Sequence, residues 1–132
     1  MKTLHLTVLT PQATVFAAAV DAVIVPIPDG WLGVLPGHAP FQSRLMRGEV
    51  LFRTAGKERV LATLGGILAV DGDTVTILTG VAALDRTMEM LEREISEEAQ
   101  RLATLEQEAE KHFNRVYRQM ARTFNHQRRR HS

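Results

Sequence analysis

The feature that most constrains this chain is the position of its helix-breaking residues. All nine Gly lie at or before Gly80, and all five Pro lie at or before Pro40, so residues 81–132 contain neither. Gly and Pro mark turns, and their absence allows a helix to continue. The sequence therefore predicts an α+β chain, with strands in its N-terminal part and helix in its C-terminal part.

Short apolar runs separated by turn signals fill the part before Gly80. The runs are Leu4–Val8, Val20–Ile27, Gly48–Arg53, Arg59–Leu64, Ile67–Val70 and Thr74–Leu78. The pair Asp71-Gly72 is a hairpin signal, because a type I′ turn requires positive φ at both central residues. Many short strands at near-regular spacing are typical of a sandwich or barrel. Residues 1–83 are predicted to form an antiparallel β-sandwich domain.

After Gly80 the apolar residues recur at steps of three, four or seven, which places them on one stripe of a helix. The stripe consists of Leu84, Met88, Leu91, Ile95, Leu102, Leu105, Ala109, Val116 and Met120. Because such a stripe must be covered, residues 84–127 are expected to fold as a two-helix hairpin. Its turn is expected at Ala103-Thr104 or at His112–Asn114. Residues 128–132 are expected to form a basic, disordered tail.

Charge divides the helical part again. Nine acidic residues lie between Asp85 and Glu110, whereas no acidic residue follows Lys111. A hairpin would bring the basic half against the acidic half, and an extended helix would offer the basic half to an acidic partner. This layout suits a two-state regulatory element. Its basic residues include Arg115, Arg118, Arg122, Arg128, Arg129 and Arg130.

The residues that enzymes and metal sites use are sparse. There is no Cys, which excludes disulfides and thiolate zinc sites. His38 has only His5 for company in the strand part, and no Ser lies in a nucleophile-elbow motif. The Gly65-Gly66 pair lacks the Gly-Lys-Ser/Thr of a phosphate loop, so it indicates tight strand packing. We expect a protein without catalytic residues, metal or cofactor, and without a nucleic-acid partner, since the net charge is only +1.

Two turns are candidates for docking surfaces. Pro36 and Pro40 bracket Gly37-His38-Ala39, and each Pro restricts its own backbone and that of the residue before it. This loop is expected to be rigid and to display an imidazole. Trp31, the only Trp, lies beside Asp29-Gly30, where a core position and an exposed interface position are both open.

The stretch Asp29–Phe41, Asp-Gly-Trp-Leu-Gly-Val-Leu-Pro-Gly-His-Ala-Pro-Phe, resembles the signature of the epsilon subunits of F-type ATP synthases. The block from Gly65 to Leu78 resembles the second block of that family, and Leu4–Pro11 resembles its first strand. The resemblance runs from about Leu4 to Asp85. It implies a non-catalytic rotor subunit with an N-terminal β-sandwich and two C-terminal helices.

In that family the sandwich binds the gamma subunit and rests on the c subunits of the rotor ring. The resemblance places Pro36, His38, Pro40, Phe41, Arg44 and Leu45 at the gamma interface. It places Pro28, Asp29, Gly30 and Trp31 at the rotor ring. The basic residues of the tail would meet acidic loops of the beta subunits and inhibit ATP hydrolysis. The chain would then be a monomer when isolated, and peripheral at the cytoplasmic face of a bacterial plasma membrane.

The helical part departs from the family. Nucleotide-binding members have an Arg where this chain has Met88, in Leu84-Asp85-Arg86-Thr87-Met88, so we do not expect ATP to be bound. The divergent tail is similar to that of the alternate, sometimes sodium-coupled branch of bacterial enzymes. Two other classes remain open from the residues alone. One is a β-sandwich adaptor that oligomerises through a coiled coil, and the other is a cupin-type enzyme, for which His5 and His38 supply too few ligands.

Overall fold

The computed structural model describes residues 2–130, with side chains described for residues 2–124. The chain divides into two compact units, one up to Glu92 and one from Arg93 onward. The boundary lies later than the predicted sandwich boundary at residue 83, because the first residues of the C-terminal helix belong to the first unit. Each unit is described by itself below.

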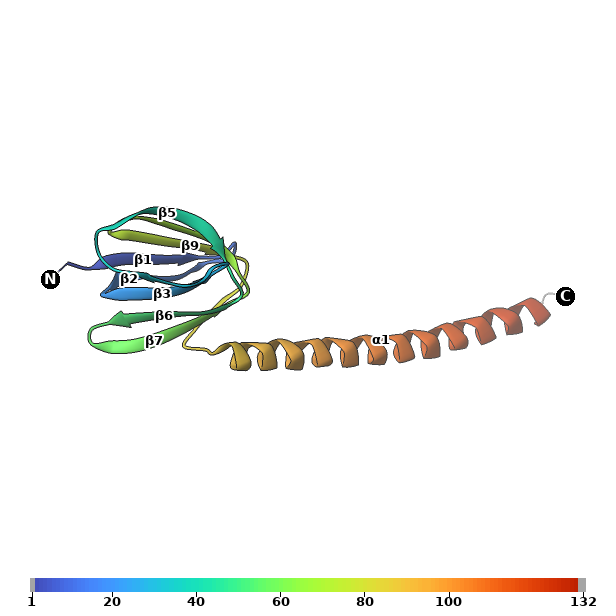
Figure 1. Ribbon diagram of the computed structural model, residues 1–132. Coiled ribbons are helices and arrows are strands. Elements are labelled where there is room, and N and C mark those ends of the chain that lie inside the picture. The colour runs from blue at the N-terminus through green and yellow to red at the C-terminus, as the bar shows by residue number, and fades with distance from the viewer. Residues whose placement is uncertain (1, 131–132) are drawn as a thin grey trace. The chain divides into compact units, whose positions relative to one another are not determined.

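The first unit is a sandwich of two five-stranded sheets (Figure 1). One sheet, called sheet A here, has the strand order β2-β1-β9-β8-β5, and sheet B has the order β10-β7-β6-β3-β4. Sheet A contains β1 (Leu4–Leu9), β2 (Thr14–Val20), β5 (His38–Leu45), β8 (Gly66–Gly72) and β9 (Thr74–Thr79). Sheet B contains β3 (Ala22–Ile27), β4 (Gly30–Val34), β6 (Gly48–Thr54), β7 (Lys57–Thr63) and β10 (Ala82–Leu84).

The predicted β-sandwich is confirmed, with one difference in strand direction. All neighbouring strands are antiparallel except β1 and β9, which pair in parallel from His5–Thr74 to Leu9–Leu78. This parallel pair places the first strand of the domain beside one of its last strands, inside sheet A. No strand follows Leu84 in the described part of the chain, as the absence of Gly and Pro predicts.

Alternation along each strand builds the core between the sheets. Leu4, Leu6 and Val8 of β1 face inward and are fully buried, while His5 between them is exposed. The same alternation holds on the neighbouring strands. The buried cluster consists of Leu4, Leu6, Val8, Val20, Val23, Val25, Val34, Leu45, Val50, Phe52, Leu61, Leu68, Val70, Val75 and Ile77.

The β8–β9 hairpin is present, but its turn differs from the predicted one. Asp71 pairs with Thr74, so the two central residues are Gly72 and Asp73 and not Asp71 and Gly72. Among these central residues only Gly72 has positive φ, at 61°, which excludes a type I′ turn. The inward position of Val70 sets this register, because a shift by one residue would turn the strand inside out.

The C-terminal part forms one helix, α1 (Met88–Arg130), and the expected two-helix hairpin is wrong. The helix continues through both expected turns. At the first of them, the Thr104 hydroxyl donates to the Gln100 carbonyl oxygen within the helix, at 3.0 Å. No Gly or Pro interrupts these 43 residues, so nothing in the local sequence stops the helix. It also continues through Arg130, where a disordered tail was expected from residue 128.

Candidate protein-interaction site

The outer face of sheet A carries two adjacent exposed apolar side chains. Because paired residues share a face, Leu9, Leu78, Ile67 and Arg44 form one row across β1, β9, β8 and β5. Ile67 is 56% exposed and Leu78 is 47% exposed, whereas Leu9 is half-buried. The next row consists of Thr7, Thr76, Ala69 and Gln42. We call these two rows the sheet A face.

The sheet A face is apolar or uncharged except for Arg44 at its edge. Isolated exposed apolar residues are ordinary, but an adjacent pair on a flat sheet with an uncharged surround is typical of a protein-interaction surface. The local sequence does not distinguish Ile67 and Leu78 from their buried neighbours. Their outward direction depends on the strand register, which a continuous apolar run does not reveal.

The loop before β5 is held by hydrogen bonds within it and to the β8–β9 turn. Gly37 has a φ of 81°, and its N–H donates to the Asp73 carboxylate at 2.8 Å. The His38 N–H donates to the Leu35 carbonyl oxygen at 3.2 Å, and the His38 ring nitrogen Nδ1 lies 2.7 Å from the Ala39 carbonyl oxygen. A bulge between His38 and Phe41 follows. Asp73 was not predicted as an anchor, and it connects this loop to the β8–β9 turn.

Two residues that the resemblance placed at the gamma interface point the other way. Leu45 is only 3% exposed and belongs to the core, so its side chain is not available to a partner. Phe41 packs against the same core and places its ring edge against the His38 ring, with centroids 6.5 Å apart. Both side chains face inward because β5 alternates, which leaves Arg44 on the outer face. Pro36 is half-buried and Pro40 is exposed.

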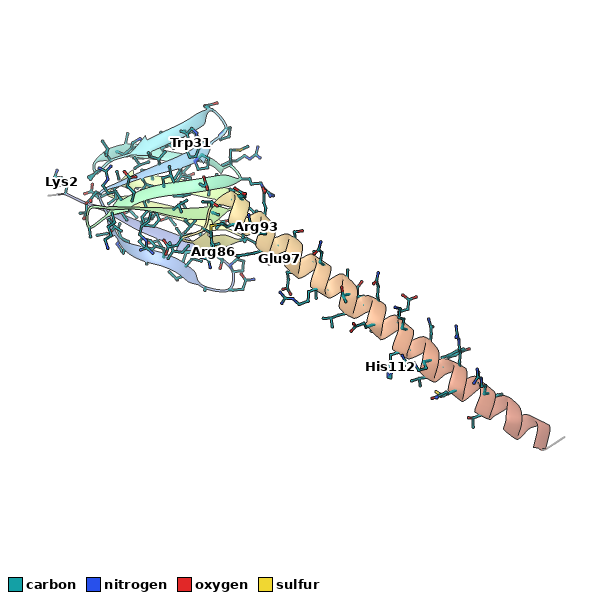
Figure 2. The ribbon with its side chains drawn as sticks, turned by 90° about the horizontal axis from the view of Figure 1, so that it is seen from below. Lys2, Trp31, Arg86, Arg93, Glu97 and His112 are labelled. Carbon is teal, nitrogen blue, oxygen red and sulfur yellow. The ribbon has the colours of Figure 1, made fainter. Side chains whose placement is uncertain are left out.

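Trp31 is on the surface and not in the core. It lies on β4 opposite Pro26 and is 61% exposed (Figure 2). Pro28, Asp29 and Gly30, which form the β3–β4 turn and the start of β4, are exposed as well. The residues that the resemblance assigns to the rotor ring therefore form one accessible hairpin end.

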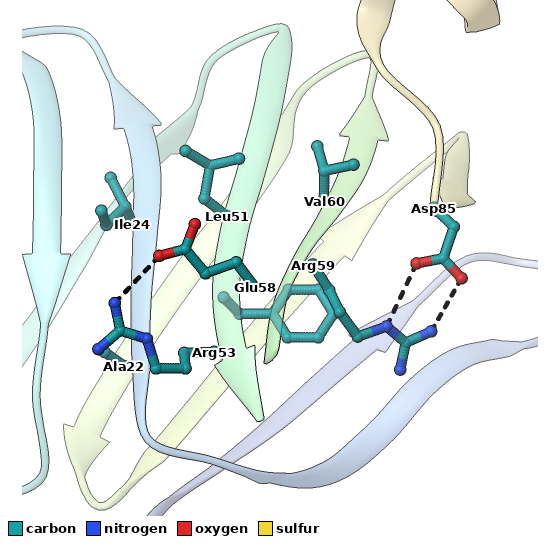
Figure 3. A pocket seen from close by; sticks show the side chains of 9 residues that line it. Ala22, Ile24, Leu51, Arg53, Glu58, Arg59, Val60 and Asp85 are labelled. Atoms are coloured by element: carbon teal, nitrogen blue, oxygen red, sulfur yellow. Dashed lines mark hydrogen bonds and ion pairs between the residues drawn. The ribbon is translucent and has the colours of Figure 1, made fainter. Parts of the chain in front are cut away.

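A pocket of about 490 Å³ opens on sheet B beside its apolar outer side chains (Figure 3). Ile24, Leu51 and Val60 lie side by side across β3, β6 and β7. Arg53 and Glu58 form an ion pair at 3.1 Å on one side. On the other side the Arg59 guanidinium donates two hydrogen bonds to Asp85, at 3.2 and 2.9 Å.

Arg59 contacts side chains of both sheets. Its guanidinium lies 5.6 Å from the ring centroids of both Phe16 and Phe52, which come from different sheets. The hydrogen bonds from Arg59 hold the pKa of Asp85 below its ordinary value of 3.8, and their attraction outweighs the opposing effect of desolvation. The pKa of Arg59 is raised by the same contact. The contact therefore favours the charged forms of both side chains.

The last described turns of α1 separate charge from aromatic surface. At 100° per residue, Lys111, Arg115, Arg118 and Arg122 fall within an arc of about 60°. The opposite face bears Phe113, Val116, Tyr117, Met120 and Phe124, of which Phe113 is 67% exposed. The Phe113 and Tyr117 rings stack with centroids 6.2 Å apart. The side chains of Arg128, Arg129 and Arg130 lie outside the described part of the chain.

Neither a metal centre nor a membrane-spanning helix is found in the described residues. No group of three or more His, Asp or Glu side chains within residues 2–124 is placed to hold a metal ion. In the part of the chain that the structure describes, no helix is both long and apolar enough to cross a bilayer.

The sandwich matches a known family model. The model for the β-sandwich domain of the ATP synthase delta/epsilon chain matches residues 3–85, which is more than half of the chain. This chain belongs to the ATP synthase delta/epsilon family. As an epsilon chain it is a non-catalytic subunit of the ATP synthase.

Curated epsilon chains extend the similarity into the helix. The ATP synthase epsilon chain of Priestia megaterium is 36% identical over 105 residues, which cover 80% of this chain and 76% of the relative. That of Maricaulis maris is 34% identical over 110 residues, covering 82% and 83%. That of Bacillus subtilis is 36% identical over 103 residues, covering 78% and 76%.

Solved structures agree on the fold. A chain of the Euglena gracilis mitochondrial ATP synthase, in a structure of OSCP, F1 and the c-ring, superposes with a TM-score of 0.62. It is 24% identical, and the match covers 74% of this chain and 64% of that one. A chain of the Tetrahymena thermophila mitochondrial central stalk and c-ring gives a TM-score of 0.52 at 14% identity, with 63% and 69% covered.

Proposed function

We propose that the sandwich couples the gamma subunit to the c subunits of the rotor. It binds gamma through the sheet A face and the c subunits through the β3–β4 turn. The exposed pair Ile67–Leu78 is the observation that carries the proposal, because it offers an apolar surface for a stable interface. Arg44, at the edge of this face, and His38, in the loop before β5, remain in the proposed gamma interface. Exposed Trp31 is the proposed anchor toward the ring. In this arrangement the subunit is peripheral to the cytoplasmic face of the membrane.

The gamma interface is tested with a matched pair of charge substitutions. Ile67→Glu buries a carboxylate in the proposed interface, and Leu51→Glu places the same charge on the outer face of sheet B, where Leu51 is 39% exposed. Affinity for purified gamma is measured by calorimetry. We expect Ile67→Glu to weaken binding by about 2 kcal/mol or more and Leu51→Glu to leave it near the parent value. Equal affinity of parent and Ile67→Glu would overturn the proposal.

We infer a regulatory role for α1 beyond Glu92. Its cationic face, with Arg115, Arg118 and Arg122, suits the acidic loops of the beta subunits, and the aromatic face suits an apolar surface opposite them. Single surface ion pairs contribute little, so the cluster has to act together. Such binding would inhibit ATP hydrolysis.

Deletion of residues 93–132 tests this role, because it retains the whole sandwich unit. We expect the assembled enzyme to synthesise ATP at a near-normal rate and to hydrolyse it faster. The same measurement on Arg115→Ala/Arg118→Ala/Arg122→Ala should show part of the increase. If the deletion leaves hydrolysis unchanged, α1 is not inhibitory.

A further inference from the structure

The connection between β10 and α1 is a corner tied to both sheets. Asp85 has a φ of 59°, an unusual value for a residue other than Gly. Its N–H donates to the Val60 carbonyl oxygen at 2.8 Å, and its carboxylate accepts two hydrogen bonds from Arg59. Since Arg59 also lies over Phe16 and Phe52, the corner is fastened to side chains of β2 and β6.

The first turn of α1 is capped from a strand. The N–H groups of the first turn lack partners within the helix. The Thr87 hydroxyl oxygen accepts from the Met90 N–H at 3.3 Å, as an N-cap residue does. The Met88 N–H donates to the Glu49 carboxylate at 3.1 Å, and Glu49 belongs to β6. A carboxylate at this end also interacts favourably with the helix dipole.

Burial and charge hold the next residues of α1. Leu91 is 5% exposed, the only residue of α1 described as buried. Arg47, just before β6, forms an ion pair with Glu92 at 2.9 Å. Ala62 is fully buried although β7 alternation places it on the outer face of sheet B, beside Glu49. The base of α1 therefore belongs to the sandwich unit, which ends at Glu92.

We propose that residues 85–92 form a clamp that keeps the base of α1 a fixed part of the sandwich, so that any rearrangement of the helix takes place beyond Glu92. Glu49 is the positioning residue of this clamp. The strand–helix connection then works as a rigid corner and not as a hinge. This inference concerns the isolated chain and does not rest on the partners proposed above.

Amide hydrogen exchange of the full-length chain, followed by NMR, tests the clamp. In the parent we expect the Met88 amide to be protected, although an amide at this position of an uncapped helix exchanges freely. Glu49→Ala should accelerate exchange at both Met88 and Leu91 by about fivefold, which corresponds to a helix cap of about 1 kcal/mol. Glu49→Gln retains an acceptor oxygen and should restore most of the protection. Strand amides report whether each variant is folded.

Glu58→Ala is the matched control, because Glu58 is an exposed glutamate of the neighbouring strand β7 that pairs with Arg53. It should leave exchange at Met88 and Leu91 unchanged. Two results would overturn the proposal. One is a Met88 amide that exchanges freely in the parent. The other is acceleration by Glu49→Ala at Met88 alone, which would reveal a local hydrogen bond that does not hold the helix base.

Discussion

Ala55 occupies the first central position of the β6–β7 turn with a φ of 51°, and Gly56 follows with 75°. Two positive φ values match a type I′ turn, in which Asn-Gly is favoured and Ala is strained. We expect Ala55→Asn to raise the free energy of unfolding by about 1 kcal/mol in a denaturant titration. Ala55→Val should lower it, because a β-branched residue tolerates positive φ least. A change in the free energy of unfolding in the same direction for both variants would contradict this account of the turn.

The ion pair of Asp85 with Arg59 makes the stability of the fold depend on pH. Its pKa is lowered in the folded chain, so the stability contributed by its pair with Arg59 is complete above the ordinary carboxyl pKa of 3.8. That contribution is lost as the pH falls through the lower, folded pKa. We expect Asp85→Asn to be less stable than the parent at pH 7 and to approach it in strong acid. Thermal unfolding at a series of pH values from about 2 to about 7 measures the stability difference between the two proteins.

Asp29→Asn is the control for that comparison, since Asp29 is an exposed aspartate of the β3–β4 turn. Its difference from the parent should stay small across the same range. A constant difference between parent and Asp85→Asn at every pH would show that the ion pair does not set the acid dependence.

At the scale of the elements, the strands β8 and β9 depend on Gly66. A Cβ at this position would overlap the Leu78 carbonyl oxygen and would lie 3.0 Å from the Thr79 Cα. Because the obstacle is backbone, Gly66→Ala should destabilise the sandwich by about 2–3 kcal/mol in a denaturant titration. Gly33→Ala is the control, since a Cβ there meets no atom within 4 Å. Equal stability of the two variants would refute the close-packing interpretation of Gly65-Gly66.

Secondary structure was predictable where the local pattern is strong. Short apolar runs between turn signals identified β1 and β9, and the position of the last Gly identified the change from strand to helix. β2 was not predicted, because its run Thr-Val-Phe-Ala-Ala-Ala-Val is buried on only one face and carries three small residues. The hairpin prediction failed for a different reason. An apolar stripe shows that a helix must be covered, but it does not show by what.

The docking surfaces were predictable only in part. The two prolines at Pro36 and Pro40 located the loop before β5, whereas the sequence left open whether Trp31 is buried or exposed. It did not distinguish the inward side chains of Phe41 and Leu45 from outward Arg44, because that depends on the β5–β8 register. The same dependence hid Ile67 and Leu78. The contact of Arg59 with Asp85 joins residues 26 positions apart and has no local signal.

At the scale of the whole molecule, the exposed apolar and aromatic side chains of α1 are compatible with two kinds of assembly, which the oligomeric state distinguishes. An epsilon chain that serves as a stalk subunit is expected to be a monomer when isolated, whereas a coiled-coil adaptor forms a stable dimer or trimer. Light scattering coupled to size exclusion measures the mass. We expect the 14.7 kDa of one chain at micromolar concentration. A concentration-independent dimer or trimer would favour the adaptor.

The central claim is that the sandwich joins gamma to the rotor ring. The most direct test is affinity purification of the tagged chain from its own cells in mild detergent, with Ile67→Glu in parallel and the co-purified subunits identified by mass spectrometry. The account predicts that gamma, beta and c subunits co-purify with the parent. It predicts that all three are depleted when the tagged chain carries Ile67→Glu. Purification of the parent without gamma and c subunits, or equal recovery with Ile67→Glu, would contradict it.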